Sequence, residues 1–267
     1  MAQRILKPLD YGAMLDELFD LYKKNFLLLS GITGIIYLPF TTLYYHEFMS
    51  VMNSIQSERV PGTANLISLG LVLLLYIPAS FFVTAATTWA VSNSYLGNKS
   101  TIIGSYKAIF KRIVPFALTM TLSSLLLMAG TIAFCIPGII IFFAISFVSQ
   151  VFIIEGKQYV DAIKRSFELV KSEWVKVLVF AILTNLVVST ITAALTAPFT
   201  LMQAFSGAPA TGTFSIIQGL AQGIAQTLAL PIQVIAFVLL YYDIRIRKEG
   251  FDIEMLAAGM ESSTTLE

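Results

Sequence analysis

Long apolar runs alternate along the chain with short segments that mix charged and apolar residues. A helix of about 20 apolar residues crosses the roughly 30 Å hydrocarbon core of a bilayer. A backbone in lipid must satisfy its hydrogen bonds within the segment, so the runs are expected to be helices. The pattern predicts an all-α integral membrane protein with six transmembrane helices, at residues 25–48, 65–95, 113–134, 139–154, 175–205 and 213–242.

Three of the polar segments are typical of amphipathic helices that lie in a membrane surface. They cover residues 8–24, 102–112 and 155–174, and each precedes an odd-numbered span. The six spans are therefore expected to form three hairpins, each preceded by a surface helix. The apolar face of the third segment recurs at steps of three and four residues, and it comprises Tyr159, Ile163, Phe167, Val170 and Trp174.

The distribution of positive charge predicts how the chain crosses the membrane. Of its 17 lysines and arginines, all except Arg59 lie near the termini or in the segments before the third and fifth spans. Arg59 belongs to an expected loop at residues 50–63. Basic residues accumulate on the cytoplasmic side of membrane proteins. Both termini and the three surface helices are therefore expected to be cytoplasmic, in a protein of the inner (plasma) membrane.

Composition agrees with this class of protein. Of the 267 residues, 57% are hydrophobic and 12% are charged, which is far more apolar than a soluble domain. The net charge of +1 gives no reason to expect a nucleic-acid partner. We expect one membrane domain at residues 1–258, without a cleavable signal peptide, and a disordered tail at 259–267. Its last residues, Leu266 and Glu267, are typical of an expression-vector remnant.

A short motif occurs twice in the chain. The segments Phe19-Asp-Leu-Tyr-Lys-Lys-Asn-Phe26 and Phe167-Glu-Leu-Val-Lys-Ser-Glu-Trp174 share an aromatic residue, an acid, a leucine, a lysine and a closing aromatic residue. We interpret them as parts of three parallel repeat units, at residues 8–97, 98–156 and 157–252. The alternative is that both simply combine the lysines and aromatic residues common at membrane interfaces.

Two groups of residues resemble hallmarks of a known family. The first is Val151-Phe-Ile-Ile-Glu155-Gly156 with Ala162-Ile-Lys-Arg-Ser166-Phe-Glu-Leu-Val, and the second is Tyr241-Tyr-Asp243-Ile-Arg245-Ile-Arg247-Lys-Glu-Gly250-Phe251-Asp252. Together they resemble the glycerophosphodiester phosphodiesterase membrane-domain family of bacteria and archaea, over nearly the whole chain up to Asp252. The resemblance implies six helices with cytoplasmic ends. It does not imply phosphodiesterase activity, because that requires a separate domain with several histidines, and His46 is the only histidine here.

Charged residues near the cytoplasmic ends of the spans form the first candidate site. Asp243 and Arg247 stand four residues apart, so they can pair on one helix face. Glu155 is the acid closest to a membrane core, and a carboxylate there needs a partner such as Arg165 or Arg245. We predict that these five residues form a cytoplasmic belt that docks the chain end on the third surface helix. The alternative is a set of weak local ion pairs beside a positive-inside signal.

A row of glutamines on the sixth span forms the second candidate site. Their spacing of four, four and seven residues places them on one helix face, beside the small residues Gly219 and Gly223. An unpaired amide in hydrocarbon is costly, so this face should contact protein or water. It could line a polar path, form an interhelical or oligomer contact, or lie partly outside the membrane core. The row comprises Gln218, Gln222, Gln226 and Gln233.

The sequence contains no metal-ligand cluster, nucleophile elbow or phosphate-binding glycine loop, so neither a cofactor nor enzymatic activity is expected. The first functional hypothesis is a non-enzymatic accessory or scaffold protein in envelope maintenance or transport. It would bind lipids and assemble with itself or with a membrane partner through its surface helices. The alternative is a carrier of lipids or small molecules along the glutamine face.

Overall fold

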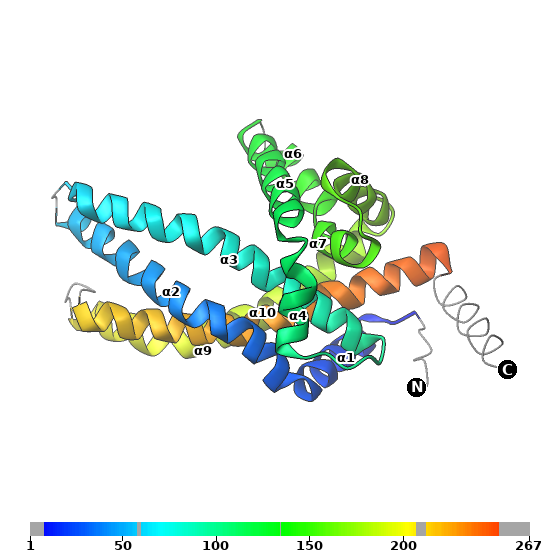
Figure 1. Ribbon diagram of the computed structural model, residues 1–267, viewed down its shortest axis with the longest axis horizontal. Coiled ribbons are helices and arrows are strands. Elements are labelled where there is room, and N and C mark those ends of the chain that lie inside the picture. Colours follow the sequence, from blue (N-terminus) through cyan, green and yellow to red (C-terminus); the bar gives the residue numbers. More distant parts are fainter. Residues whose placement is uncertain (1–7, 58–59, 134, 207–211, 251–267) are drawn as a thin grey trace.

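The computed structural model describes residues 8–57, 60–133, 135–206 and 212–250. Every regular element in these ranges is a helix, and Figure 1 shows their arrangement. The elements are α1 (Tyr11–Lys24), α2 (Phe26–Gln56), α3 (Thr63–Tyr95), α4 (Ile102–Phe110), α5 (Ile113–Ala133), α6 (Cys135–Ala144), α7 (Val148–Gln150), the π-helix η1 (Val151–Glu155), α8 (Tyr159–Val170), α9 (Trp174–Ser206) and α10 (Gly212–Glu249).

Side-chain caps set the beginnings of two of the three short helices, α1 and α4. The Asp10 carboxylate accepts a hydrogen bond from the Ala13 amide at 2.8 Å and caps α1. The Thr101 hydroxyl caps α4 in the same way, with the Gly104 amide at 3.1 Å. These bonds satisfy amides that have no partner within the first turn of a helix. The chain then passes from α1 into α2 at Asn25, so that only one residue separates them.

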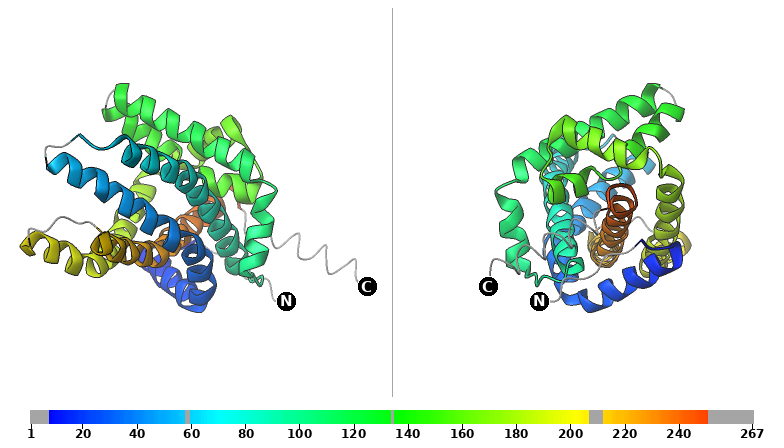
Figure 2. Two further views of the ribbon diagram at one scale, coloured as in Figure 1. Left: turned by 60° about the vertical axis from the view of Figure 1, so that its left-hand side comes forward. Right: turned by 90° about the vertical axis from the view of Figure 1, so that its right-hand side faces the viewer.

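Helix α10 lies at the centre of the molecule. It contacts α1, α2, α3, α7 and α9, and the right-hand view of Figure 2 shows it surrounded by other helices. Residues 231–246 are its most deeply buried part, and Tyr241 and Tyr242 have no solvent-exposed surface. A helix that is apolar on all sides is expected to be enclosed by others. The core of the described chain therefore forms around α10.

Five described helices are long and apolar enough to cross a membrane: α2, α3, α5, α9 and α10. The predicted fourth span, 139–154, nearly coincides with the helical segment Ile140–Glu155, in which a three-residue turn separates α6 from α7 and η1. A sixth crossing is counted only if residues 140–155 and α8 are taken as one span bent by 115°. The described chain is thus all-helical, with five helices long and apolar enough to cross a membrane, whereas the sixth crossing stays a prediction.

One predicted boundary was wrong. Residues 50–56 are helical and belong to α2, so the expected loop at 50–63 is much shorter. Val51 packs into the structure with 7% exposure, which favours continuing the helix. Helix α10 runs past the predicted end of the sixth span as far as Glu249, which agrees with the expected pairing of Asp243 and Arg247 on one helix face. Basic residues in its last turn interact favourably with the negative end of the helix dipole and support this extension.

The order of elements repeats a simple pattern. Each of α1, α4 and α8 is a short helix that precedes a longer one, and the following pairs α2/α3, α5/α6 and α9/α10 are each in contact. The third surface helix is shorter than predicted, because Glu155 ends η1 and Trp174 begins α9. Internal duplication and the three repeat units stay predictions, as does the tail at 259–267, which lies outside the described residues.

Candidate functional site

The first predicted site is built around the Glu155 carboxylate at the end of η1. The Arg165 Nε atom of α8 lies 3.0 and 2.9 Å from its two oxygens. The Tyr241 hydroxyl of α10 donates to Oε1 at 2.8 Å, and Arg245 Nε lies 3.9 Å from the same oxygen. Lys157 adds a third cation at 3.4 Å. The carboxylate is only 10% exposed, and it joins η1, α8 and α10.

Glu249, near the end of α10, completes this network. Its carboxylate accepts hydrogen bonds from Arg165 Nη2 and from Arg245 Nε, the second at 3.0 Å. Burial alone would lower the pKa of the Arg165 guanidinium, but its hydrogen bonds to Glu249 and Glu155 raise that pKa above the ordinary value for arginine. Both arginines therefore stay charged and bind two acids from different elements. We call Glu155, Arg165, Arg245 and Glu249 the arginine cluster.

Asp243 and Arg247 form a separate group, which we call the Asp243 cluster together with Lys176 and the Leu9 backbone. Asp243 is 1% exposed at its side chain. It pairs with Lys176 of α9, lies 3.0 Å from Arg247 Nε, and accepts from the Leu9 amide at 2.7 Å. The Leu9 carbonyl accepts in turn from Lys176 Nζ at 3.1 Å and from Arg247 Nη2 at 2.9 Å. One peptide unit ahead of α1 is thus held by α9 and α10.

The structure therefore divides the five residues of the predicted belt between two clusters. Glu155, Arg165 and Arg245 come together, whereas Asp243 and Arg247 bind the segment before α1. Sequence reasoning missed Lys176. The one available signal was its position, a lysine two residues inside an apolar helix, where a buried charge needs an acid.

Lys248 adds a further link between α10 and α8. Its ammonium group donates to the carbonyl oxygens of Glu168 at 2.9 Å and Leu169 at 2.8 Å. These carbonyls lie in the last turn of α8, where they have no partner within the helix. A cation there also interacts favourably with the helix dipole. The end of α10 is thus tied to α8 by side chains on several of its faces.

The first residue of the glutamine row makes a contact between helices. Gln218 is 4% exposed, and its Nε2 atom donates to Gln203 Oε1 of α9 at 3.1 Å. Gln222, Gln226 and Gln233 are partly exposed. A cavity of about 260 Å³ between α9 and α10 is lined by apolar residues such as Phe199 and Ile224 and by none of the four glutamines. The polar path stays a prediction, and Gln218 makes an interhelical contact.

The two glycines beside the glutamine row face α2. A Cβ atom added at Gly219 would lie 3.0 Å from the Cα and carbonyl oxygen of Thr42, and one at Gly223 would lie 3.2 Å from the Cα of Leu38. At the same contact between α2 and α10, His46 Nδ1 lies 2.7 Å from the Ser215 hydroxyl. Small residues allow two helices to approach this closely. His46 thus contributes to the contact between α2 and α10.

The described residues contain no group of histidine, cysteine, aspartate or glutamate side chains placed to hold a metal ion. In both clusters each carboxylate is bound by cations, and each arginine by a carboxylate. Ion pairs of this kind hold elements together and leave no free base or nucleophile. The chemistry that this arrangement supports is thus structural.

Comparisons with known proteins identify no relative that would bear on these clusters. No family model, no curated protein and no solved structure matches the chain. The resemblance to the glycerophosphodiester phosphodiesterase membrane-domain family therefore stays a prediction from the residues quoted above.

Proposed function

We propose that the protein is a non-catalytic, multi-pass inner-membrane protein that acts as an accessory or scaffold, in envelope maintenance or transport. In this proposal both chain ends are cytoplasmic, and the surface helices bind a second copy or another membrane protein. The observation that carries it is the pair of ion clusters. They fasten α8, α9, α10 and the segment before α1 into one unit at the end of the helices that bears most of the basic residues.

A rigid unit of this kind is suited to presenting a binding surface. Buried ion pairs contribute little net stability compared with apolar packing, and their best-supported role is to specify one arrangement. The cost of ordering a surface on binding falls when that surface is already held in place. The clusters would thus keep α8 and the start of α9 in a fixed orientation for a partner.

The surface next to the arginine cluster has the chemistry of a helix-binding site. A hollow of about 340 Å³ lies between α6, α8 and the start of α9, and it is lined by Phe143, Phe167, Val170 and Trp174. Phe167 is 42% exposed and Trp174 is 50% exposed. Aromatic residues are enriched at the centres of protein interfaces. An apolar helix of a partner fits this hollow, whether it comes from a second copy or from another protein.

The test replaces the two aromatic residues and uses the repeated motif for its control. The variant is Phe167→Ala/Trp174→Ala, and the matched control is Phe19→Ala/Phe26→Ala, which truncates the corresponding residues of α1 and α2. Protein extracted gently from its host membrane is examined by native mass spectrometry. We expect a defined oligomer or a stoichiometric partner for the wild type and the control, and a loss of that complex for the Phe167/Trp174 variant.

Two outcomes would overturn the proposal. One is a wild-type protein that is monomeric and free of protein partners under gentle extraction from its host. The other is an equal effect of both double variants, because it would trace the loss to exposed aromatic residues in general. Thermal unfolding of each variant separates a lost interface from a lost fold.

A further inference from the structure

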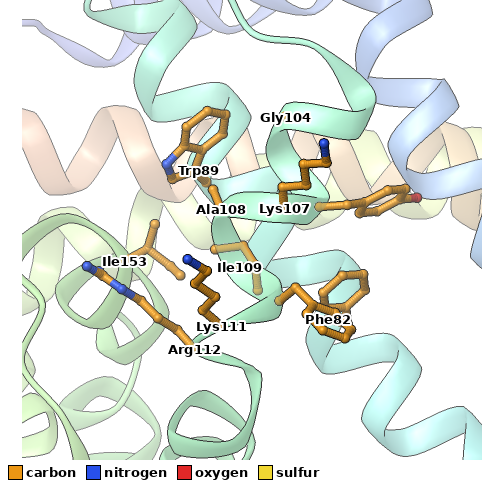
Figure 3. Close-up of a pocket in the computed structure, with 11 residues that line it drawn as sticks. Phe82, Trp89, Gly104, Lys107, Ala108, Ile109, Lys111, Arg112 and Ile153 are labelled. Carbon is orange, nitrogen blue, oxygen red and sulfur yellow. The ribbon is translucent and has the colours of Figure 1, made fainter.

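A second groove lies on the other side of the molecule, beside the surface helix α4. It has a volume of about 830 Å³ and runs between α4, α3 and η1 (Figure 3). Its lining combines apolar walls with positive charges and contains no acid. The residues that matter for its chemistry are Phe82, Trp89, Lys107, Lys111, Arg112 and Ile153.

The apolar wall of the groove is held in place by packing. Phe82 stacks on Tyr106, with ring centroids 5.3 Å apart and planes at 19°. The Tyr106 hydroxyl donates to the Ile32 carbonyl of α2 at 2.6 Å, which fixes that ring. Phe82 and Trp89 are seven residues apart on α3, so they share a helix face and lie about 10 Å apart along its axis. The wall is a strip that follows α3 from near its end toward its middle.

The cations of the groove differ from those of the two clusters. Lys107, Lys111 and Arg112 are exposed, and within the described chain none of them has an ion pair or a side-chain hydrogen bond. In Figure 3 the head groups of Lys111 and Arg112 point the same way, beside Ile153, whereas Lys107 points away from them. Two positive charges without a counter-ion thus meet at one side of an apolar strip.

The groove lies near the ends of helices long and apolar enough to cross a membrane, where lipid head groups are expected. It is formed where the surface helix α4 meets the last turns of α3, and Arg112 directly precedes α5. Basic residues at the ends of membrane helices attract anionic lipids, and a guanidinium binds a phosphate through two parallel hydrogen bonds. A soluble anion would bind the cations and leave the apolar strip empty.

We propose that this groove binds an anionic phospholipid of the surrounding membrane. The lipid phosphate lies between Lys111 and Arg112, and an acyl chain follows the strip formed by Phe82 and Trp89. Neither group takes part in the ion clusters. The proposal does not depend on the scaffold function, because it concerns a different surface and a different ligand.

The test measures lipid binding to delipidated protein in detergent. Dioleoyl phosphatidylglycerol is titrated against the wild type, Lys111→Gln/Arg112→Gln, and the charge-matched control Lys23→Gln/Lys164→Gln, whose lysines are exposed and lie on α1 and α8. Binding is read by native mass spectrometry. Because each basic residue near an anionic lipid contributes to attraction, we expect affinity to fall about tenfold or more for the Lys111/Arg112 variant. The control should stay within about twofold of the wild type.

A second variant tests the apolar half of the site without changing its charge. Ala108 lines the groove, and Ala108→Phe should fill it and weaken phosphatidylglycerol binding, with an unchanged thermal midpoint to show that the protein is folded. Two probes distinguish the source of the anion. Dioleoyl phosphatidylcholine should bind more weakly, and inorganic phosphate should not compete.

The proposal fails under any of three results. Equal binding of phosphatidylcholine and phosphatidylglycerol would remove the role of the cations. Effective competition by inorganic phosphate would make the groove a site for soluble anions. An equal loss for the control variant would assign the effect to general surface charge.

Discussion

The Asp243 carboxylate has almost no access to solvent, and its neighbours compensate for the free-energy cost of burying its charge. Lys176, Arg247 and the Leu9 amide all donate to it. Removing one partner of a buried ion pair leaves an uncompensated charge, which costs far more than the intact pair contributes. Asp243 is therefore the residue at which the fold is most sensitive to a small chemical change.

Asp243→Asn should strongly destabilise the protein while keeping the shape of the side chain. We expect a loss of about 3–5 kcal/mol in the free energy of unfolding, since Lys176 and Arg247 then lack a counter-charge. The measurement is thermal or denaturant unfolding in detergent. Asp20→Asn is the control, because Asp20 is 49% exposed and pairs with an exposed Lys24, so its loss should cost under about 1 kcal/mol. Equal stability of Asp243→Asn and wild type would contradict this account.

Part of this cluster could be predicted from the sequence, and part could not. The pairing of Asp243 with Arg247 follows from their spacing of four residues on one helix. Lys176 and Leu9 lie 67 and 234 residues away from Asp243 along the chain. No local pattern relates positions so far apart, so their contact became visible only when α9 and the segment before α1 were placed against α10.

At the scale of elements, the close contact between α2 and α10 depends on residues without large side chains. Gly219 has the Thr42 backbone, not a flexible side chain, as its nearest neighbour. A methyl group there must push two helices apart. The predicted row of glutamines and the glycine pair lie on the same helix, but only the glycines have a clear packing role across to α2.

Gly219→Ala should weaken the α2/α10 contact. The added Cβ would lie 3.0 Å from backbone atoms, so we expect a loss of about 1–3 kcal/mol in unfolding free energy, as for overpacked cores. The control is Gly70→Ala in α3, where a Cβ meets no atom within 4 Å. That change should be neutral or stabilising by up to about 1 kcal/mol, because alanine favours a helix. If both variants have the same free energy of unfolding, the close approach of Gly219 to α2 does not limit the packing of the two helices.

The fourth predicted span shows why the sequence did not predict where the helices are interrupted. Its apolar composition is correct for a buried segment, yet the chain there forms α6, a turn, α7 and a π-helix instead of one rod. Hydropathy reports how apolar a stretch is and does not report where it bends. The 115° bend follows residue 155 and turns α8 back toward this segment, where the Ser166 hydroxyl of α8 accepts a hydrogen bond from the Phe147 amide at 3.0 Å.

At the scale of the whole molecule, the ends of the long helices differ in composition. The described parts of both chain ends lie at the same end of the molecule as α1, α4 and α8, whereas the connection between α2 and α3 lies at the other end (Figure 1). The basic residues of the described chain are at the first end. The positive-inside rule therefore predicts that this end faces the cytoplasm.

Cysteine labelling tests that orientation. In a Cys135→Ala background, Ser57→Cys and Ser172→Cys place a single thiol at exposed positions after α2 and before α9. A membrane-impermeant maleimide should label the Ser57 variant in intact cells and the Ser172 variant only in inverted vesicles. Unmodified Cys135→Ala protein controls for background labelling. The reverse pattern would show that the basic end faces outward.

The sequence by itself determined that the chain is helical, that several of its helices are long and apolar enough to cross a membrane, and that its charges are distributed asymmetrically. Those properties follow from composition and periodicity within short segments, because whether a segment favours lipid or water depends on its own residues. Only the tertiary structure decided that α10 is enclosed, that the charged belt is two clusters, and that α4 forms a basic groove with α3 and η1. These features join residues that are distant in the chain, because buried charges and close-packed surfaces are satisfied by whichever elements the fold brings beside them.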